Sequence, residues 1–170
     1  MADFHTELVA LMPRLRRFAI GLTGSVTDGD DLVQSAIERA LKSQASFRPE
    51  LSFSSWMFKI AQNLWIDQKR SEARRGITID IDETYDLTGE DGRTVAEQRN
   101  MTKKVLAAIQ ALPDGQRLVV SHVLVDGRSY KETASVLGVP VGTVMSRLAR
   151  ARKILEEQVL GGHPRQGAVL

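Results

Sequence analysis

The sequence contains no cysteine among its 170 residues, and aromatic residues make up only 5% of the chain. The lack of cysteine excludes a disulfide framework and any metal site built on thiolates. The three histidines, His5, His122 and His163, are scattered, and no segment has the pattern of a phosphate loop, a metal-ligand set or a paired nucleophile and base. We therefore expect a protein that is not an enzyme and that needs no cofactor or metal.

Long apolar runs are also missing. No stretch approaches the roughly 20 apolar residues that a membrane-spanning helix needs. The N-terminus has no basic segment followed by an apolar run, which is the pattern of a secretory signal. The sequence therefore predicts a cytoplasmic protein that makes no membrane contact of its own.

Neither sign of charge dominates the chain, whose formal net charge is +2. The charges are instead divided locally. Residues 76–100 carry seven acidic and two basic side chains, whereas residues 141–155 carry four basic side chains and no acidic one. A basic segment in a near-neutral protein indicates a polyanion-binding surface, although it also suits a solvated helix face.

Apolar residues recur at helical spacing along most of the chain, and no alternating strand pattern is present. Asp28 or Asp30 is the expected N-cap of the second predicted helix, because a short side-chain oxygen can accept from a free N–H of the first turn. Trp56 is expected in the core, whereas Trp65 lies off the main apolar stripe and its role stays open. The predicted helices cover residues 4–22, about 30 to 44, 54 or 55 to 75, 94–112, 113–125, 129–137 and 141–158.

The predicted fold class is all-α, with two small helical domains. Residues 1–75 form the first domain and residues 94–160 the second. Residues 76–93 lack helical periodicity and are acidic, so they are predicted to be a flexible linker. Residues 161–170 are predicted to be a disordered tail. The sequence does not decide whether the free protein is open or compact.

A helix-turn-helix motif is predicted near the C-terminus. Ser129 and Glu132 fit the capping-box pattern of a short helix, and Gly138 lies in the turn before a second helix. The apolar stripe of that second helix consists of Val144, Leu148, Ala151 and Leu155. The outer face is basic, as a DNA recognition helix requires. By itself the motif indicates a DNA-binding module, and an ordinary helical hairpin with surface arginines is the alternative.

Three segments resemble extracytoplasmic-function (ECF) RNA polymerase sigma factors of the sigma-70-related family, in the family's order and spacing. Residues 30–36, Asp-Asp-Leu-Val-Gln-Ser-Ala, are similar to the segment that binds polymerase. Phe47-Arg48 together with residues 55–63 resembles the region that captures the minus-ten promoter element. Residues 138–152 resemble the reader of the minus-thirty-five element. The resemblance implies sigma region 2 in the first domain and sigma region 4 in the second.

The resemblance implies a polymerase-binding site on the second predicted helix. The family uses it to grip the clamp of the largest polymerase subunit, and the flap of the second largest subunit is a further expected contact. The clamp helices are basic in the family, so an acidic and polar patch complements them. A solvated, Asp-capped helix start is the alternative. The implied residues are Asp30, Asp31, Leu32, Gln34, Ser35 and Glu38.

A minus-ten site is implied on the third predicted helix and the loop before it. Asn63 sits where the family hydrogen-bonds a flipped base, and its amide offers both a donor and an acceptor to a Watson–Crick edge. The loop at residues 47–53 would wall that pocket, and basic side chains would follow the backbone. The implied residues are Arg48, Ser52, Phe53, Asn63, Asp67, Lys69, Arg70, Arg74 and Arg75.

A minus-thirty-five site is implied on the last predicted helix. Base-facing positions are Met145, Ser146, Ala149 and Arg150, whereas Arg147 and Arg152 fit phosphate contacts and Thr143 lies at the helix N-terminus. Many relatives have Lys or Arg where Met145 stands. Because a methionine cannot donate a hydrogen bond, Met145 would contact a thymine methyl group or pack.

The resemblance therefore implies a sigma factor that binds core RNA polymerase and directs promoter-specific initiation. It would read the minus-thirty-five duplex and capture melted minus-ten bases. An anti-sigma factor is a further partner expected from the family. The alternatives are a sigma-mimicking adaptor that sequesters an anti-sigma factor without binding DNA, and a plain helix-turn-helix repressor.

Overall fold

The computed structural model describes residues 3–76 and 92–161, and every regular element in these two stretches is a helix. The all-α fold class is thus confirmed. Most of the predicted linker and nearly all of the predicted tail lie outside the described residues.

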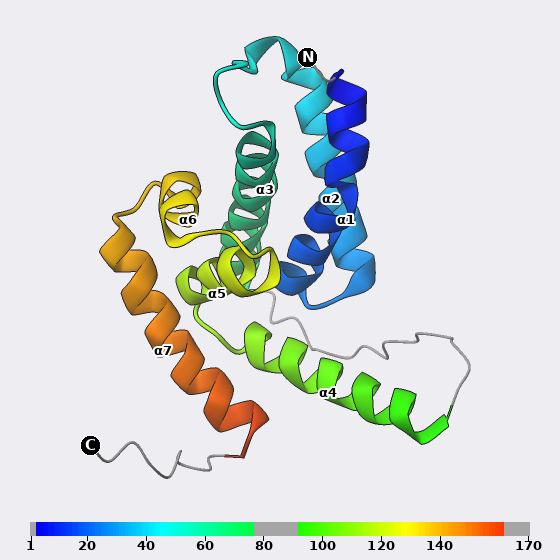
Figure 1. The fold of residues 1–170 in the computed structure, drawn as a ribbon, viewed down its shortest axis with the longest axis vertical. Helices are drawn as coiled ribbons and strands as arrows, with labels where there is room; N and C mark the ends of the chain where they lie inside the picture. Colours follow the sequence, from blue (N-terminus) through cyan, green and yellow to red (C-terminus); the bar gives the residue numbers. More distant parts are fainter. Residues whose placement is uncertain (1–2, 77–91, 162–170) are drawn as a thin grey trace.

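The first half is an antiparallel arrangement of three long helices (Figure 1). They are α1 (Phe4–Thr23), α2 (Val26–Lys42) and α3 (Phe53–Arg75), with a 3-10 turn, η1 (Gln44–Ser46), in the connection before α3. Their apolar stripes meet in a core that includes Leu15, Phe18, Ala36, Phe58 and Ala61, all without exposed surface. Helical spacing produces this packing because residues three and four apart share one face.

The N-cap predicted for the second helix was wrong. The helix begins at Val26, and Ser25 caps it by accepting a hydrogen bond from the Asp28 backbone N–H at 3.2 Å. The preceding Gly24 has a φ of 77°, so α1 ends there in the left-handed conformation that glycine adopts most readily. The sharp turn at Gly24 lets the next helix begin earlier than the acidic residues suggested.

The second half contains α4 (Gly92–Gln110), α5 (Asp114–Val120), α6 (Tyr130–Leu137) and α7 (Val141–Val159). The predicted single helix reaching Val125 is in fact α5 followed by a π-helical segment, η2 (Ser121–Val125). Ile109, Leu112, Val119, Val144 and Leu148 are among the residues of its core. In Figure 1, α4 lies below α1, and α7 lies to the left of α5.

The two halves pack against each other. Leu118 of α5 and Val136 of α6 belong to the same buried cluster as the residues of α1, α2 and α3. Trp65, whose role the sequence left open, is 2% exposed, and the Arg117 guanidinium lies 5.4 Å from its ring centre. Trp56 is only half-buried, against the edge of the core. The described parts of the free chain therefore form one closed unit.

Candidate polymerase- and DNA-binding surfaces

The predicted polymerase-binding residues lie on α2, and most of them face outward. Asp30 accepts two hydrogen bonds from Arg16 of α1, at 2.6 and 3.2 Å, and these bonds lower the pKa of the Asp30 carboxyl group. Leu32 differs from the rest, because it is 4% exposed and packs in the core. Leu32 therefore packs beneath the outer side of α2 and offers little accessible area for contact with a partner protein. The exposed members are Asp30, Asp31, Gln34, Ser35 and Glu38.

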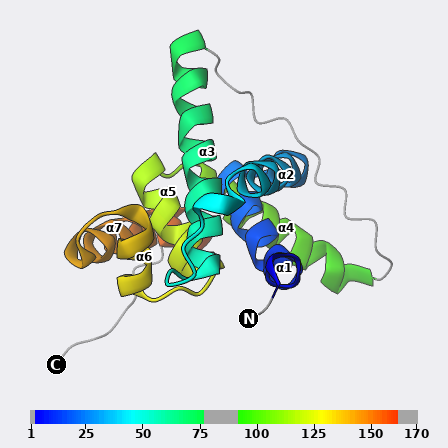
Figure 2. The same cartoon turned by 90° about the horizontal axis from the view of Figure 1, so that it is seen from above.

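The predicted minus-ten residues of α3 share one solvent-facing side of the helix. Asn63, Asp67, Arg70 and Arg74 are all exposed, in keeping with their spacing of four, three and four residues. Lys69 lies beside them but is partly engaged: its ammonium group is 3.6 Å from Glu72 and 5.9 Å from the Trp65 ring centre. Figure 2 shows that the last turns of α3, which end at Arg75, project beyond the other helices.

The loop before α3 forms an aromatic-walled cavity of about 360 Å³. Phe53 makes edge contacts with Phe4 at 5.2 Å and with Phe47 at 5.6 Å, measured between ring centres. Ser52 caps α3 by accepting from the Ser55 N–H, and Arg48 is exposed. The cavity is lined by Phe4, Glu7, Gln44, Phe47, Pro49, Leu51 and Phe53.

Asn63 is not among the residues that line this cavity. It lies ten residues after Phe53 on the same helix, which corresponds to roughly 15 Å along the axis. Asn63 therefore lies further along α3 than the cavity that the loop lines, and a base-binding pocket that includes both stays a prediction.

The helix-turn-helix is present with its predicted local chemistry. Ser129 accepts from the Glu132 N–H at 3.1 Å, and Glu132 Oε2 accepts from the Ser129 N–H at 2.9 Å, so the capping box is confirmed. Gly138 ends α6 with a φ of 67°, which allows the sharp turn into α7. Of the predicted apolar stripe of α7, Val144, Leu148 and Ala151 are buried and Leu155 is half-buried.

The predicted minus-thirty-five residues lie on the opposite side of α7. Met145, Ser146, Ala149, Arg150 and Arg152 are exposed. Arg147 and Thr143 are half-buried, and the Arg147 guanidinium lies close to Gly115 of α5. The Arg147 side chain therefore packs partly against α5. The other exposed residues form a surface with short side chains, Ser146 and Ala149, near the start of α7 and basic side chains, Arg150 and Arg152, further along the helix.

Sequence reasoning missed a buried polar group where the two halves meet. Gln62 and His122 are 3% and 0% exposed, yet they come from α3 and η2, on opposite sides of the predicted linker. The only sequence signal was Gln62, a polar side chain next to the apolar Ala61 on the inner side of α3, and such a residue does not reveal its partner.

Two family models match the chain: Sigma-70 region 2 over residues 8–75 and Sigma-70, region 4 over residues 102–155. The ECF RNA polymerase sigma factor EcfG of Rhodopseudomonas palustris (strain TIE-1) is 35% identical over 158 residues, covering 90% of this chain and 83% of the relative. This chain belongs to the ECF RNA polymerase sigma factors. The resemblance seen in the sequence is thereby confirmed.

Further relatives of this sigma factor agree. The ECF RNA polymerase sigma-E factor of Escherichia coli (strain K12) is 32% identical over 145 residues, covering 79% of this chain and 76% of the relative. Among solved structures, the co-crystal structure of the sigma factor RpoE with the anti-sigma factor NepR from Bartonella quintana contains a chain that matches with a TM-score of 0.77 and 28% identity. That match covers 96% of this sigma factor and the whole of the other chain.

A more distant match concerns the fold alone. A chain in the co-crystal structure of the anti-anti-sigma factor PhyR with NepR from Bartonella quintana has a TM-score of 0.62 and 16% identity, over 92% of the sigma factor and 51% of that chain. Within residues 3–76 and 92–161 of the sigma factor, no helix is both long and apolar enough to cross a bilayer.

Proposed function

We propose that this sigma factor binds core RNA polymerase and directs it to promoters, reading the minus-thirty-five duplex with α7 and capturing melted minus-ten bases with α3 and the loop before it. The observation that carries the proposal is the division of α7 into a buried apolar side and an exposed outer side. The exposed side begins with the short Ser146 and Ala149 and continues with Arg150 and Arg152. Short side chains permit close approach to base edges, and basic ones suit phosphates.

The polymerase contact is assigned to the outer side of α2. Asp31, Gln34, Ser35 and Glu38 are exposed there, and their acidic and polar character complements a basic partner helix. The family's use of this segment to bind the clamp supports the assignment. The flap contact of region 4 follows from the same family relationship.

The minus-ten contact is assigned to two positions along α3. The aromatic cavity at the loop has the walls that base stacking requires, and Asn63 offers both hydrogen-bond donors and an acceptor. A single strand that lies along the exposed side of α3 would meet the cavity first and then Asn63, Arg70 and Arg74. Capture of unstacked bases favours the melted state, because the duplex cannot make these contacts.

The deciding experiment is in vitro transcription with core polymerase and genomic DNA, followed by sequencing of the RNA start sites. We expect new start sites that share a minus-ten and a minus-thirty-five element and that require this protein. The proposal fails if core polymerase gains no new start site and shows no affinity for the protein.

A second candidate function is a sigma-mimicking adaptor that sequesters an anti-sigma factor. The likeness in fold to a chain of the PhyR–NepR complex favours it. The exposed basic side chains of α7 favour the sigma factor, because an adaptor has no need of them. A promoter-DNA shift assay with added core polymerase separates the two. An anti-sigma partner fits both, since the RpoE structure is a complex with NepR.

A further inference from the structure

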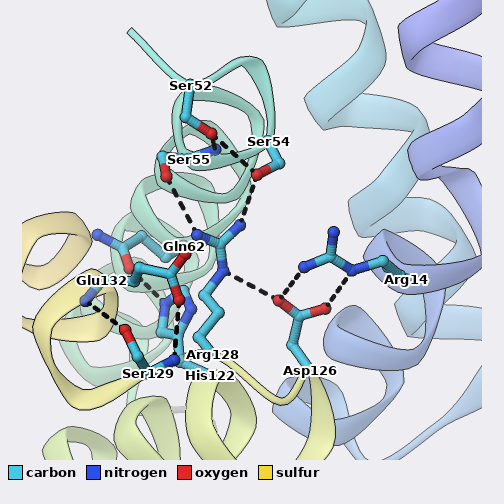
Figure 3. A network of polar contacts seen from close by, with 10 residues as sticks. All are labelled: Arg14, Ser52, Ser54, Ser55, Gln62, His122, Asp126, Arg128, Ser129 and Glu132. Atoms are coloured by element: carbon cyan, nitrogen blue, oxygen red, sulfur yellow. Dashed lines mark hydrogen bonds and ion pairs between the residues drawn. The ribbon is translucent and has the colours of Figure 1, made fainter.

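Packing, and not a polar partner, holds the side chain of Arg147 on α7. It is half-buried, yet within the described part of the chain its guanidinium has no hydrogen bond or ion pair. Other partly buried arginines differ: Arg14 and Arg128 both donate to the carboxylate of Asp126 (Figure 3), and Arg117 donates to backbone oxygens. The N–H donors of the Arg147 guanidinium are therefore available to bind an anion.

The group against which Arg147 packs is a glycine. A β-carbon added at Gly115, the second residue of α5, would lie 3.3 Å from Cζ of Arg147, 3.4 Å from Nη1 and 3.5 Å from Nε. These are the three nearest atoms that it would meet outside its own stretch of helix. The guanidinium of Arg147 therefore fills the space that a side chain at position 115 would occupy.

The backbone does not require a glycine at position 115. Gly115 lies within α5 and does not have a positive φ, so an alanine could adopt the same conformation. Glycine is less favourable than alanine inside a helix, because it loses more conformational freedom on folding. Room for the Arg147 guanidinium is the gain that the structure shows in return.

Arg147 lies at the margin of the exposed side of α7. It is half-buried, whereas Ser146 just before it and Arg150 one turn later are exposed. In a recognition helix, the centre of the exposed side faces the base edges and its margins face the phosphates. The position of Arg147 therefore suits a phosphate contact.

We propose that Gly115 is a positioning residue for DNA binding: it leaves the space in which the Arg147 guanidinium lies, and so directs that group at a backbone phosphate of the minus-thirty-five duplex. The inference rests on the proposed function, because a phosphate contact requires that α7 binds DNA. Packing restricts the Arg147 side chain in the free protein, so it loses less freedom when the contact forms. Arg152, which is exposed, lacks this support.

The packing can be tested without DNA by the chemical reactivity of the arginines. Phenylglyoxal modifies accessible guanidinium groups, and mass spectrometry of peptides assigns a rate to each arginine. Gly115→Ala should raise the rate at Arg147 several-fold and leave that at Arg150 unchanged, because the added carbon displaces only the Arg147 side chain. Gly142→Ala is the matched control: Gly142 is the second residue of α7, and a β-carbon there would meet nothing within 4 Å.

The effect on DNA binding is measured with holoenzyme and a promoter fragment that carries a minus-thirty-five element. Arg147→Ala should weaken binding roughly tenfold and reduce the slope of log K against log salt concentration by about 0.9, the value for one phosphate contact. Gly115→Leu, whose side chain would take the place of the guanidinium, should approach the same loss. Gly115→Ala should lie between Gly115→Leu and the unmodified protein.

A double-mutant cycle separates positioning from a general effect on α5. In the Arg147→Ala background, Gly115→Ala should have no further effect on DNA affinity, because no guanidinium is left to displace. A change in α5 itself would instead add to the effect of Arg147→Ala. Because alanine is a better helix former than glycine, we expect Gly115→Ala to fold.

Three results would overturn the inference. They are equal reactivity of Arg147 with and without Gly115→Ala, additive losses in the double-mutant cycle, and an Arg147→Ala variant that loses affinity for core polymerase rather than for DNA. If Arg147→Ala binds the promoter normally, the inference fails and the proposed function stands. If the unmodified protein binds no promoter while Gly115→Ala still exposes Arg147, the proposed function and the phosphate contact fail together, and only the packing of Arg147 on Gly115 stands.

Discussion

His122 Nε2 lies 2.9 Å from Gln62 Oε1, and the two residues are 60 positions apart in the sequence. The contact joins region 4 to region 2 in the middle of the molecule. Burial, and to a smaller extent the charge of Arg128, lowers the pKa of His122 from 6.5 to about 3. The imidazole is therefore neutral at physiological pH, which allows it to pack against the rings of Phe18 and Phe58.

Lowering the pH from 7 to 5 should destabilise the folded protein by about 2 kcal/mol through His122 alone. The unfolded chain, with a His pKa of about 6.5, binds the proton more readily than the folded one. The contribution of neutral His122 is thus complete above about pH 6.5 and declines as the pH falls toward the folded-state pKa of about 3. Urea unfolding at both pH values measures it.

The matched variant is His122→Gln, which keeps a donor for Gln62 but does not titrate. Its stability should change less between pH 7 and pH 5 than that of the unmodified protein. The carboxyl groups of Asp30 and Glu132, whose pKa values are lowered by their hydrogen bonds, lose their contributions only below their ordinary values of 3.8 and 4.5. An identical pH dependence in both proteins would argue against burial of a neutral His122.

Replacing Ser129 by alanine should destabilise the protein by about 1 kcal/mol, because the N-cap hydroxyl that accepts from Glu132 N–H is lost. Ser135→Ala is the control, since Ser135 is exposed in the middle of α6. Thermal or urea unfolding of the two variants gives the comparison. Equal stability of both would mean that the capping box contributes nothing measurable.

Replacing Arg150 by alanine should weaken promoter binding by roughly 1–3 kcal/mol if the guanidinium reads a base. The loss should depend on the base pair at one position of the minus-thirty-five element. Arg152→Ala, by contrast, should weaken all sequences alike and reduce the salt dependence. Binding of holoenzyme to a set of single-base promoter variants distinguishes the two patterns, and a sequence-independent loss for Arg150→Ala would exclude base reading.

Replacing Asn63 by alanine should impair open-complex formation more than polymerase binding, because the exposed amide is assigned to an unstacked base. Gln68→Ala removes another exposed amide from the same helix and serves as the control. Permanganate footprinting of melted thymines and a polymerase-binding assay provide the two readouts. Equal loss in both assays would contradict base capture by Asn63.

Much of the local structure was predictable from the sequence. The first helix was predicted over residues 4–22 and spans Phe4–Thr23, and the last was predicted over 141–158 and spans Val141–Val159. The exposed sides of α3 and α7 followed from the same spacing, as did the capping box of α6. The cap of α2 was misassigned because several residues near Ser25 can each serve as an N-cap.

The tertiary structure alone decided how the two halves meet. Helical periodicity depends on residues three and four apart, so the sequence determined the helices, their outer faces and the membership of the sigma family. Burial of Trp65 and His122 depends instead on partners more than 50 residues away, such as Arg117 and Gln62. Contacts of that range leave no periodic mark in the chain, which is why only the folded molecule shows how regions 2 and 4 pack together.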